Sequence, residues 1–138
     1  MLVRAMTLGW HLDLIEPSTT PLQKVEKCYD FTAMSPLQVS KSLDDIHKAR
    51  KVIIGGGAVS QKLVENLQGT HTRAYHTYGM TETASHIAVR ELCPIYEGSF
   101  TVLENITIHK DQEGRLVVHA PELTRASLVT NDLVELLN

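Results

Sequence analysis

Cysteine is scarce in this chain, and long hydrophobic runs are absent. Cys28 and Cys93 lie far apart and outside any C-x-x-C pattern, which argues against a structural disulfide and a zinc knuckle and predicts free, buried or half-buried thiols. No apolar run approaches the ~18 residues that a membrane span requires. The N-terminal segment contains Arg4 but lacks the apolar region and the small-residue cleavage site of a signal peptide. We therefore expect a cytoplasmic protein with no membrane span.

Neither sign of charge dominates. The 138 residues include 13 Lys and Arg and 16 Asp and Glu, for a net charge of −3, and the charges are scattered. The lack of a basic block argues against nucleic acid or an anionic membrane as a partner. The six histidines other than His86 show no metal-ligand spacing, so we expect surface or capping roles for them. The oligomeric state stays open.

Short β-prone segments alternate with helical segments up to residue 93. Strands are predicted over 10–15, 31–34, 51–54 and 73–77, and helices over 1–8, 22–28, 37–43 and 61–67. Ser35 followed by Pro36, and Ser60, predict helix starts, whereas Gly9 predicts a helix end. This alternation predicts an α/β fold with a mostly parallel sheet flanked by helices.

The pattern changes after Pro94, where only strand-like segments follow. Strands are predicted over 100–103, 105–110, 115–120, 127–130 and 133–137, and residues 111–114 read as a hairpin loop closed by a glycine. We therefore expect a short antiparallel β portion at 94–138 after an α/β portion at 1–93. One compact unit and two subdomains are both compatible with the sequence.

Chemistry-bearing residues gather at the end of the strand over 73–77, where open α/β sheets bind ligands. Tyr78 offers a ring for a base, and Gly79 allows a sharp turn. Thr81 offers a hydroxyl for a phosphate, and Glu82 offers a hard oxygen for Mg²⁺. The segment therefore predicts a nucleotide and metal site. A glycine turn with a solvated Thr-Glu pair is the structural alternative.

Three segments in order resemble motifs of the adenylate-forming, acyl-activating enzyme superfamily. Tyr78–Thr83 reads Y-G-M-T-E-T and is similar to the adenylation motif. Val52–Ser60 resembles the strand and glycine turn that precede it, and Leu128–Val134 resembles the later T-G-D-L/I motif. The resemblance implies part of the N-terminal domain of an acyl-CoA synthetase, an ATP-dependent acid–CoA ligase.

The resemblance also implies roles for single residues. Tyr78 would pack on adenine, and Asp132 would accept hydrogen bonds from the ribose hydroxyls. Thr81 would contact the α-phosphate and Glu82 would bind Mg²⁺, which makes these two the implied catalytic residues. Gly79 and Met80 complete the nucleotide-binding corner.

Two further segments are implied to meet the ligands. The glycine turn would line the boundary between the adenine and acyl pockets, with Gly57 on the nucleotide side and Gly55 and Gly56 on the substrate side. Ser85 and His86 follow the adenylation motif where the acyl pocket of the superfamily begins. A helix-start or strand role without ligand contact is the alternative for these two.

The chain departs from the superfamily pattern at two positions. Asn131 replaces the glycine of T-G-D and still tolerates a left-handed turn, and Ala58 replaces a frequent proline. The details of the three motifs resemble the o-succinylbenzoate–CoA ligase branch, which implies that acid as substrate, menaquinone biosynthesis as pathway, ATP/AMP with Mg²⁺, and coenzyme A as co-substrate. Another acyl- or aryl-CoA synthetase, or a non-catalytic nucleotide-binding module, is the alternative.

Two parts of the superfamily pattern have no match in this sequence. One is the Ser/Thr/Gly-rich loop that holds the β- and γ-phosphates, and the other is the mobile C-terminal domain with its catalytic lysine. We therefore expect an internal fragment that shows no ligase turnover alone.

Overall fold

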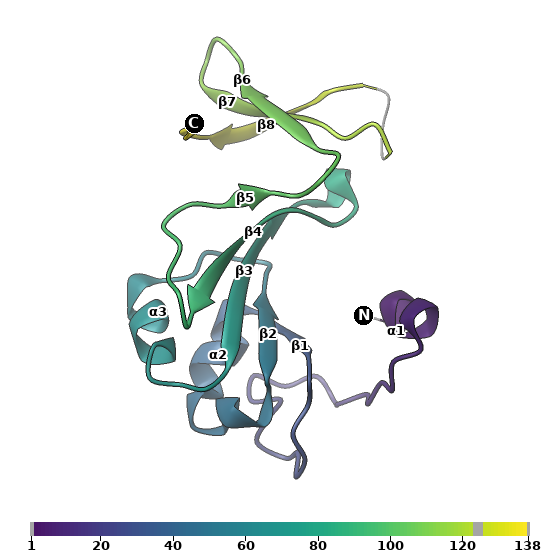
Figure 1. Ribbon diagram of the computed structural model, residues 1–138, viewed down its shortest axis with the longest axis vertical. Coiled ribbons are helices and arrows are strands. Elements are labelled where there is room, and N and C mark those ends of the chain that lie inside the picture. Colours follow the sequence, from purple (N-terminus) through teal and green to yellow (C-terminus); the bar gives the residue numbers. More distant parts are fainter. Residues whose placement is uncertain (1, 123–125, 138) are drawn as a thin grey trace. The chain divides into compact units, whose positions relative to one another are not determined.

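The structure is a computed structural model that describes residues 2–122 and 126–137. Met1 of the predicted first helix lies outside the described residues. The chain forms two compact units: unit 1 contains Met1–His76 and Glu91–Glu97, and unit 2 contains Thr77–Arg90 and Gly98–Asn138. The strand orders are β1-β2-β3-β4-β5 in one sheet and β6-β7-β8 in another (Figure 1).

The larger sheet is mixed. Strands β1 (Thr32–Met34), β2 (Lys51–Ile54) and β3 (Arg73–Gly79) pair in parallel, which confirms three of the predicted strands and the parallel layer. Strand β4 (His86–Cys93) pairs with β5 (Thr101–Val102) in the antiparallel sense. The expectation of an α/β portion followed by a separate antiparallel portion is therefore correct only in part, because an antiparallel pair belongs to the larger sheet.

Two capped helices cover the apolar side of β2 in unit 1. Helix α2 (Pro36–Lys41) begins with a capping box in which the Gln38 N–H donates to Ser35 Oγ (3.3 Å) and the Ser35 N–H donates to Gln38 Oε1 (2.9 Å). Helix α3 (Gln61–Leu67) begins at Ser60, whose Oγ accepts from the Leu63 N–H at 3.3 Å. The buried core joins apolar residues of these helices, the 3₁₀ turn η1 (Leu43–Lys48) and the strands: Leu22, Met34, Val39, Ile46, Ala49, Val52, Ile54, Leu63, Val64, Leu67, Ala74, Leu92 and Cys93.

The N-terminal segment of unit 1 differs from the prediction. Helix α1 (Leu2–Leu8) ends as expected at Gly9, which has a φ of +67°. The predicted strand at 10–15 is wrong, because these residues pair with no strand among those the structure describes; Trp10 instead packs on Phe31 with ring centroids 5.8 Å apart. The predicted helix at 22–28 is also wrong, since it offers the core only Leu22 and part of Val25.

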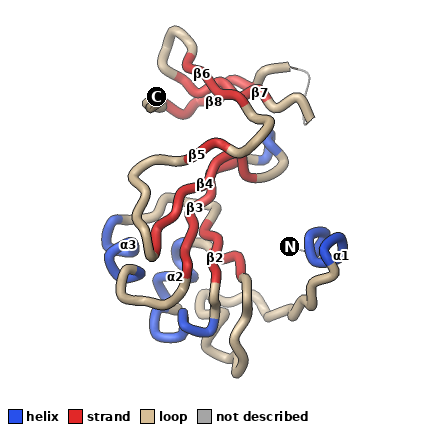
Figure 2. The backbone as a smooth tube through the Cα atoms, in the orientation of Figure 1, coloured by secondary structure: helices blue, strands red, loops and turns tan. Residues whose placement is uncertain are grey.

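Unit 2 is built from strands and loops around a small core. Strands β6 (Thr107–Lys110), β7 (Arg115–His119) and β8 (Leu128–Leu133) form an antiparallel sheet (Figure 2). The predicted hairpin loop is confirmed: Asp111 Oδ1 accepts backbone N–H groups of Glu113 and Arg115 at 2.9 Å. The two strands predicted at 127–130 and 133–137 are wrong as separate elements, because β8 is one strand. The core is formed by Ile87, Leu116, Val118 and Ala120, with Tyr78, Ile106, Ile108, Leu128 and Val134 packed against it.

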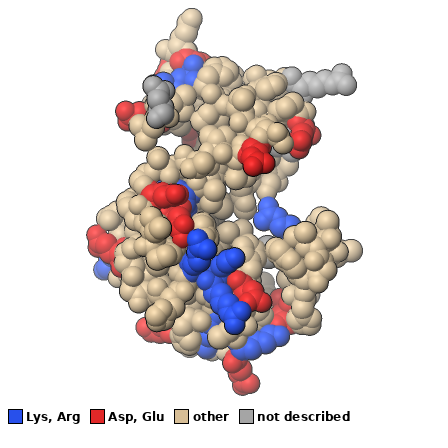
Figure 3. Space-filling view, in the orientation of Figure 1, with Lys and Arg blue, Asp and Glu red and all other residues tan. Residues whose placement is uncertain are grey.

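Charged side chains of both signs share the surface. On the face shown in Figure 3, basic side chains lie beside acidic ones. Ion pairs within unit 1 join Arg73 to Glu91 (3.2 Å) and Lys27 to Asp13 (2.6 Å). Within the described residues, no helix has the length and apolar character that a membrane crossing requires.

Candidate functional site

The predicted nucleotide corner connects β3 to β4. Strand β3 ends at Gly79, a 3₁₀ turn η2 (Thr81–Thr83) follows, and the chain enters β4 after Ala84, whose φ is +55°. A Cβ atom on Gly79 would overlap the carbonyl oxygen of Ser85 and lie 2.9 Å from the Cα of His86. Glycine is therefore required at this position by close backbone approach, and the φ angle plays no part.

A buried hydroxyl holds the corner together. Thr83 is only 2% exposed, and its Oγ1 accepts the backbone N–H of Met80 at 3.0 Å. The same hydroxyl lies 2.9 Å from Met80 O and 2.8 Å from Ser85 O, which compete for its single proton. Because a buried hydroxyl must find partners, Thr83 fixes both sides of the turn and leaves its neighbours Thr81 and Glu82 exposed.

Thr81 and Glu82 form a donor set that suits a phosphate and a magnesium ion. Both side chains are exposed. In the described part of the chain, no three His, Cys, Asp or Glu side chains gather as a metal cage. Mg²⁺ at nucleotide sites usually takes one or two carboxylates and completes its shell with phosphate oxygens and water. The single Glu82 carboxylate beside a hydroxyl fits that mode of binding.

Tyr78 is half-buried. Its ring packs against the core of unit 2 and lies 6.1 Å from the Phe100 ring centroid, with the planes tilted by 59°. Arg90 in turn places its guanidinium 4.7 Å from the Phe100 centroid. Burial, together with the neighbouring carboxylate of Asp132, raises the pKa of the Tyr78 phenol well above its ordinary value. The phenol therefore remains a protonated donor at neutral pH.

Asp132 lies in a bulge of β8. Val117 pairs with Val129 and Arg115 pairs with Leu133, so the chain advances two residues along β7 and four along β8. The Asp132 N–H has left the ladder and donates to Thr130 Oγ1 at 3.1 Å. Bulges of this kind redirect side chains, and here the exposed carboxylate of Asp132 accepts a hydrogen bond from the Tyr78 hydroxyl at Oδ2.

The glycine turn belongs to unit 1. The Gly55 N–H donates to Met34 O (3.2 Å), and Gly56 has a φ of +75° that favours glycine. His76 is 8% exposed, and its Nε2 donates to Gly57 O at 3.2 Å. The expectation of a surface or capping role is therefore wrong for this histidine, since it is buried and holds the turn.

The structure joins some of the predicted site residues and separates others by unit. Tyr78, Gly79, Met80, Thr81 and Glu82 share unit 2 with Ser85, His86 and Asp132, whereas Gly55, Gly56 and Gly57 are in unit 1. Ser85 is exposed and His86 is half-buried. Sequence reasoning missed Thr83 and Phe100. The signal for Thr83 was its place as the last residue of Y-G-M-T-E-T; Phe100 carries no comparable local signal.

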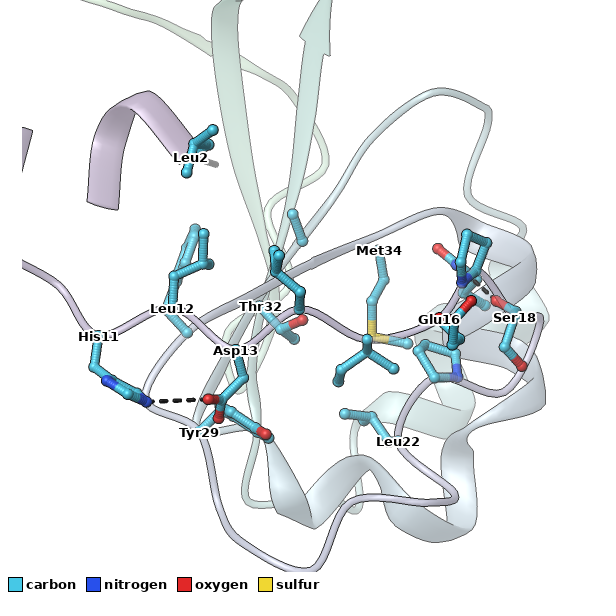
Figure 4. Close-up of a pocket in the computed structure, with 17 residues that line it drawn as sticks. Leu2, His11, Leu12, Asp13, Glu16, Ser18, Leu22, Tyr29, Thr32 and Met34 are labelled. Atoms are coloured by element: carbon cyan, nitrogen blue, oxygen red, sulfur yellow. Dashed lines mark hydrogen bonds and ion pairs between the residues drawn. The ribbon is translucent and has the colours of Figure 1, made fainter. Parts of the chain in front are cut away.

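A cavity of about 330 Å³ lies elsewhere in unit 1. Figure 4 shows residues of the segment 11–18 facing Leu22, Tyr29, Thr32 and Met34 across it, with His11 3.0 Å from Asp13. None of the predicted site residues, all of which the structure describes, lines this cavity. Most of the residues predicted to bind the nucleotide lie instead at the exposed corner of unit 2.

Comparison with known proteins identifies the fold. No protein-family model matches the chain. A curated 2-succinylbenzoate–CoA ligase of Geobacillus sp. (strain WCH70) is 33% identical over an alignment of 93 residues, and the match covers 57% of this chain and 18% of that ligase. An acyl-CoA synthetase (AMP-forming)/AMP-acid ligase II-like protein from Dyadobacter fermentans DSM 18053 superposes with a TM-score of 0.90 at 33% identity, over 99% of this chain and 41% of that one.

A third relative shares the fold at lower identity. The o-succinylbenzoate coenzyme A synthetase of Bacillus subtilis, solved in complex with ATP and magnesium ion, superposes with a TM-score of 0.59 at 18% identity over 71% of this chain and 24% of that one. The chain thus spans less than half the length of each of these relatives. The resemblance predicted from three motifs is confirmed: the chain has the fold of the matched part of the AMP-forming acyl-CoA synthetases and is similar to them in sequence.

Proposed function

We propose that this chain supplies the adenylate-binding part of an ATP-dependent acid–CoA ligase. In that reaction a carboxylate attacks the α-phosphate of ATP and releases pyrophosphate, and the thiol of coenzyme A then displaces AMP from the acyl-adenylate. The observation that carries the proposal is the hydrogen bond from Tyr78 to Asp132. It brings together residues 54 positions apart, each from a different motif with an implied role at the same nucleoside.

Each residue of the corner has a role in this proposal. The ring of Tyr78 stacks on adenine, and the carboxylate of Asp132 accepts hydrogen bonds from the ribose. Thr81 donates its hydroxyl to an α-phosphate oxygen, and Glu82 holds Mg²⁺, which when bound neutralises charge on the phosphates. Gly79 keeps the backbone close enough to β4 to fix this order of side chains.

We propose o-succinylbenzoate as the acid, in menaquinone biosynthesis. The Geobacillus relative, at 33% identity, is a ligase for that acid. Another acyl- or aryl-CoA synthetase is the second candidate. It is favoured by the Dyadobacter protein, an acyl-CoA synthetase (AMP-forming)/AMP-acid ligase II-like protein whose TM-score of 0.90 exceeds the 0.59 of the Bacillus enzyme.

The test uses the complete polypeptide that carries this chain. ATP-dependent pyrophosphate release is measured with o-succinylbenzoate, benzoate and octanoate, with and without coenzyme A. We expect release with o-succinylbenzoate above the other two acids, and none from the 138-residue chain alone. Equal release with benzoate or octanoate would support the second candidate, and AMP binding without turnover in the complete polypeptide would indicate a non-catalytic module.

A matched pair of variants tests the nucleotide site itself. Asp132→Asn is expected to weaken AMP binding by about tenfold, since a hydrogen bond to a charged group contributes about 1.5 kcal/mol or more. Glu135→Gln removes an exposed carboxylate three residues away and should leave the affinity unchanged. Calorimetry measures both. Equal affinities in the two variants would remove Asp132 from the site.

A further inference from the structure

The ring and the hydroxyl of Tyr78 have different functions in the proposed site. Stacking on a base needs only an aromatic ring, which phenylalanine also offers. Yet the hydroxyl of Tyr78 donates a hydrogen bond to Oδ2 of Asp132. We infer that this hydroxyl is a positioning group: it orients the Asp132 carboxylate toward the sugar and makes the site selective for ribonucleotides over deoxyribonucleotides. The inference rests on the proposed nucleotide site and adds a source of sugar specificity to it.

The donor is held in place by packing. Tyr78 lies near the end of β3 and packs against the buried core of unit 2, which includes Ile87 at 2% exposure. The Phe100 ring also packs near the Tyr78 ring, at 6.1 Å between centroids. A ring held in this way has little rotamer freedom, so its hydroxyl points to one place.

The acceptor has no comparable support of its own. Asp132 is exposed and lies in the bulge of β8, where its backbone is held by the bond to Thr130 Oγ1. Within the described residues, Tyr78 is the one side chain that hydrogen-bonds its carboxylate. An exposed aspartate without such a bond samples several rotamers, and ordering it on ligand binding costs entropy. The phenol therefore orders the carboxylate before any ligand arrives.

The remaining acceptor capacity suits a vicinal diol. A carboxylate has two oxygens and about four lone-pair sites. The phenol engages Oδ2, which leaves Oδ1 and the second lone pair of Oδ2 for the two hydroxyls of a ribose. A sugar without these hydroxyls leaves the ordered carboxylate unpaired, and sites built to hydrogen-bond a hydroxyl discriminate strongly against analogues that lack it.

A purely structural role for the hydrogen bond between Tyr78 and Asp132 leads to a different prediction. If the bond only stabilised unit 2, its removal would weaken every ligand by the same factor, because all ligands need the same folded corner. If the bond orients Asp132, its removal weakens only those ligands that reach the carboxylate through sugar hydroxyls. The two roles are therefore separated by a series of sugars on one base.

The experiment measures the binding of AMP, 2′-deoxy-AMP and 2′,3′-dideoxy-AMP by calorimetry to the full chain and to Tyr78→Phe, with thermal unfolding recorded in parallel. Tyr96→Phe, which removes the hydroxyl of a tyrosine that is 45% exposed, is the control and should bind all three like the parent. For Tyr78→Phe we expect AMP affinity to fall about tenfold, the size of one hydrogen bond to a charged group, and dideoxy-AMP affinity to change less than twofold.

Each outcome decides between the two roles. Loss of the preference for AMP over dideoxy-AMP in Tyr78→Phe, with unchanged dideoxy-AMP binding, supports the positioning role. An equal loss for all three nucleotides, or no loss for any, overturns it while leaving the nucleotide site intact. If the parent chain binds none of the three, the proposed function itself fails, and the inference fails with it.

Discussion

Unit 1 has the larger buried core, whereas unit 2 contains most of the residues proposed to bind the nucleotide. Unit 1 buries thirteen apolar residues in one core, with two helices whose first turns are capped. The core cluster of unit 2 has four buried members, with partly buried residues packed against it. The residues proposed to bind the nucleotide, apart from the glycine turn, belong to unit 2. Binding sites are commonly drawn from the less stable parts of a fold, and in unit 2 polar contacts must replace packing as the source of order.

The largest effect is expected from the core of unit 1. Leu67 of α3 is fully buried, so Leu67→Ala should lower the free energy of unfolding of unit 1 by about 3 kcal/mol, from lost burial and a cavity. Glu65→Ala, at an exposed position of the same helix, should change it by less than about 0.5 kcal/mol. Hydrogen exchange of the β2 amides measures both. Unaltered β2 protection in Leu67→Ala would contradict the assignment of unit 1 as the stable unit.

A smaller but more local effect is expected at the corner of unit 2. Gly79→Ala places a Cβ against the backbone of Ser85 and His86, and such overpacking typically costs about 2 kcal/mol. Gly98→Ala, in the same unit and with no atom within 4 Å of the added Cβ, is the control. We expect Gly79→Ala to lose AMP binding and the protection of β4, with β2 unchanged. Equal behaviour of the two variants would show that the corner tolerates a side chain.

Thr83 tests how far hydrogen bonds replace packing in unit 2. Thr83→Val keeps the shape of the side chain but removes the hydroxyl that hydrogen-bonds the backbone of Met80 and Ser85, a loss of about 1–2 kcal/mol. Thr81→Val, at an exposed position two residues earlier, should leave stability unchanged while lowering nucleotide affinity. Thr83→Ser should restore the hydrogen bonds. Chemical denaturation and AMP calorimetry on the three variants separate stability from binding, and equal stability of Thr83→Val and the parent would refute the role of the hydroxyl.

The smallest effect is a pH dependence confined to unit 1. Hydrogen bonds from Lys27 and then Tyr29 lower the pKa of Asp13 to about 2, from an ordinary value of 3.8. Because the folded state favours the carboxylate, this stabilisation is fully present above pH 3.8 and is lost as the pH falls toward 2. Asp13→Asn should remove this slope for the segment 11–18, whereas Glu26→Gln should keep it. Hydrogen exchange of the segment 11–18 between pH 2 and 5 compares the two variants. Equal pH dependence in both would show that the ion pair between Lys27 and Asp13 does not form in solution.

Local signals predicted the elements that depend on local physics. Ser35 with Pro36, and Ser60, marked the starts of α2 and α3 because a cap is built from adjacent residues. The segment at 10–15 has the composition of a strand, yet whether it becomes one depends on a partner that only the tertiary fold supplies. Strand β4 was missed although its neighbours in the sheet, β3 and β5, are the strands directly before and after it in the chain.

The candidate site also combines features that the sequence predicts with features that depend on the tertiary fold. The residue types of the corner were readable because the motif names them in order, and their ligand roles stay predictions, as does the division of the chain at residue 93. The resemblance assigned Tyr78 and Asp132 to the same nucleotide, but it did not predict the hydrogen bond between them, since the bulge that presents Asp132 depends on the register of β8 against β7. Asn131 can tolerate a left-handed turn but does not adopt one in the structure. Apart from glycines, the described residues with positive φ are Ala84 and Asn105.

The bulge in β8 has a consequence for how this surface can change. Side chains alternate along a strand with a period of two, and the bulge adds two residues relative to β7. Leu128 and Val134, on either side of it, therefore both pack against the core of unit 2. Deleting two residues within 130–132 would restore a regular ladder between β7 and β8 and would keep Leu128 and Val134 packed against the core. The bulge that carries Asp132 could therefore be inserted or deleted without changing the rest of the sheet.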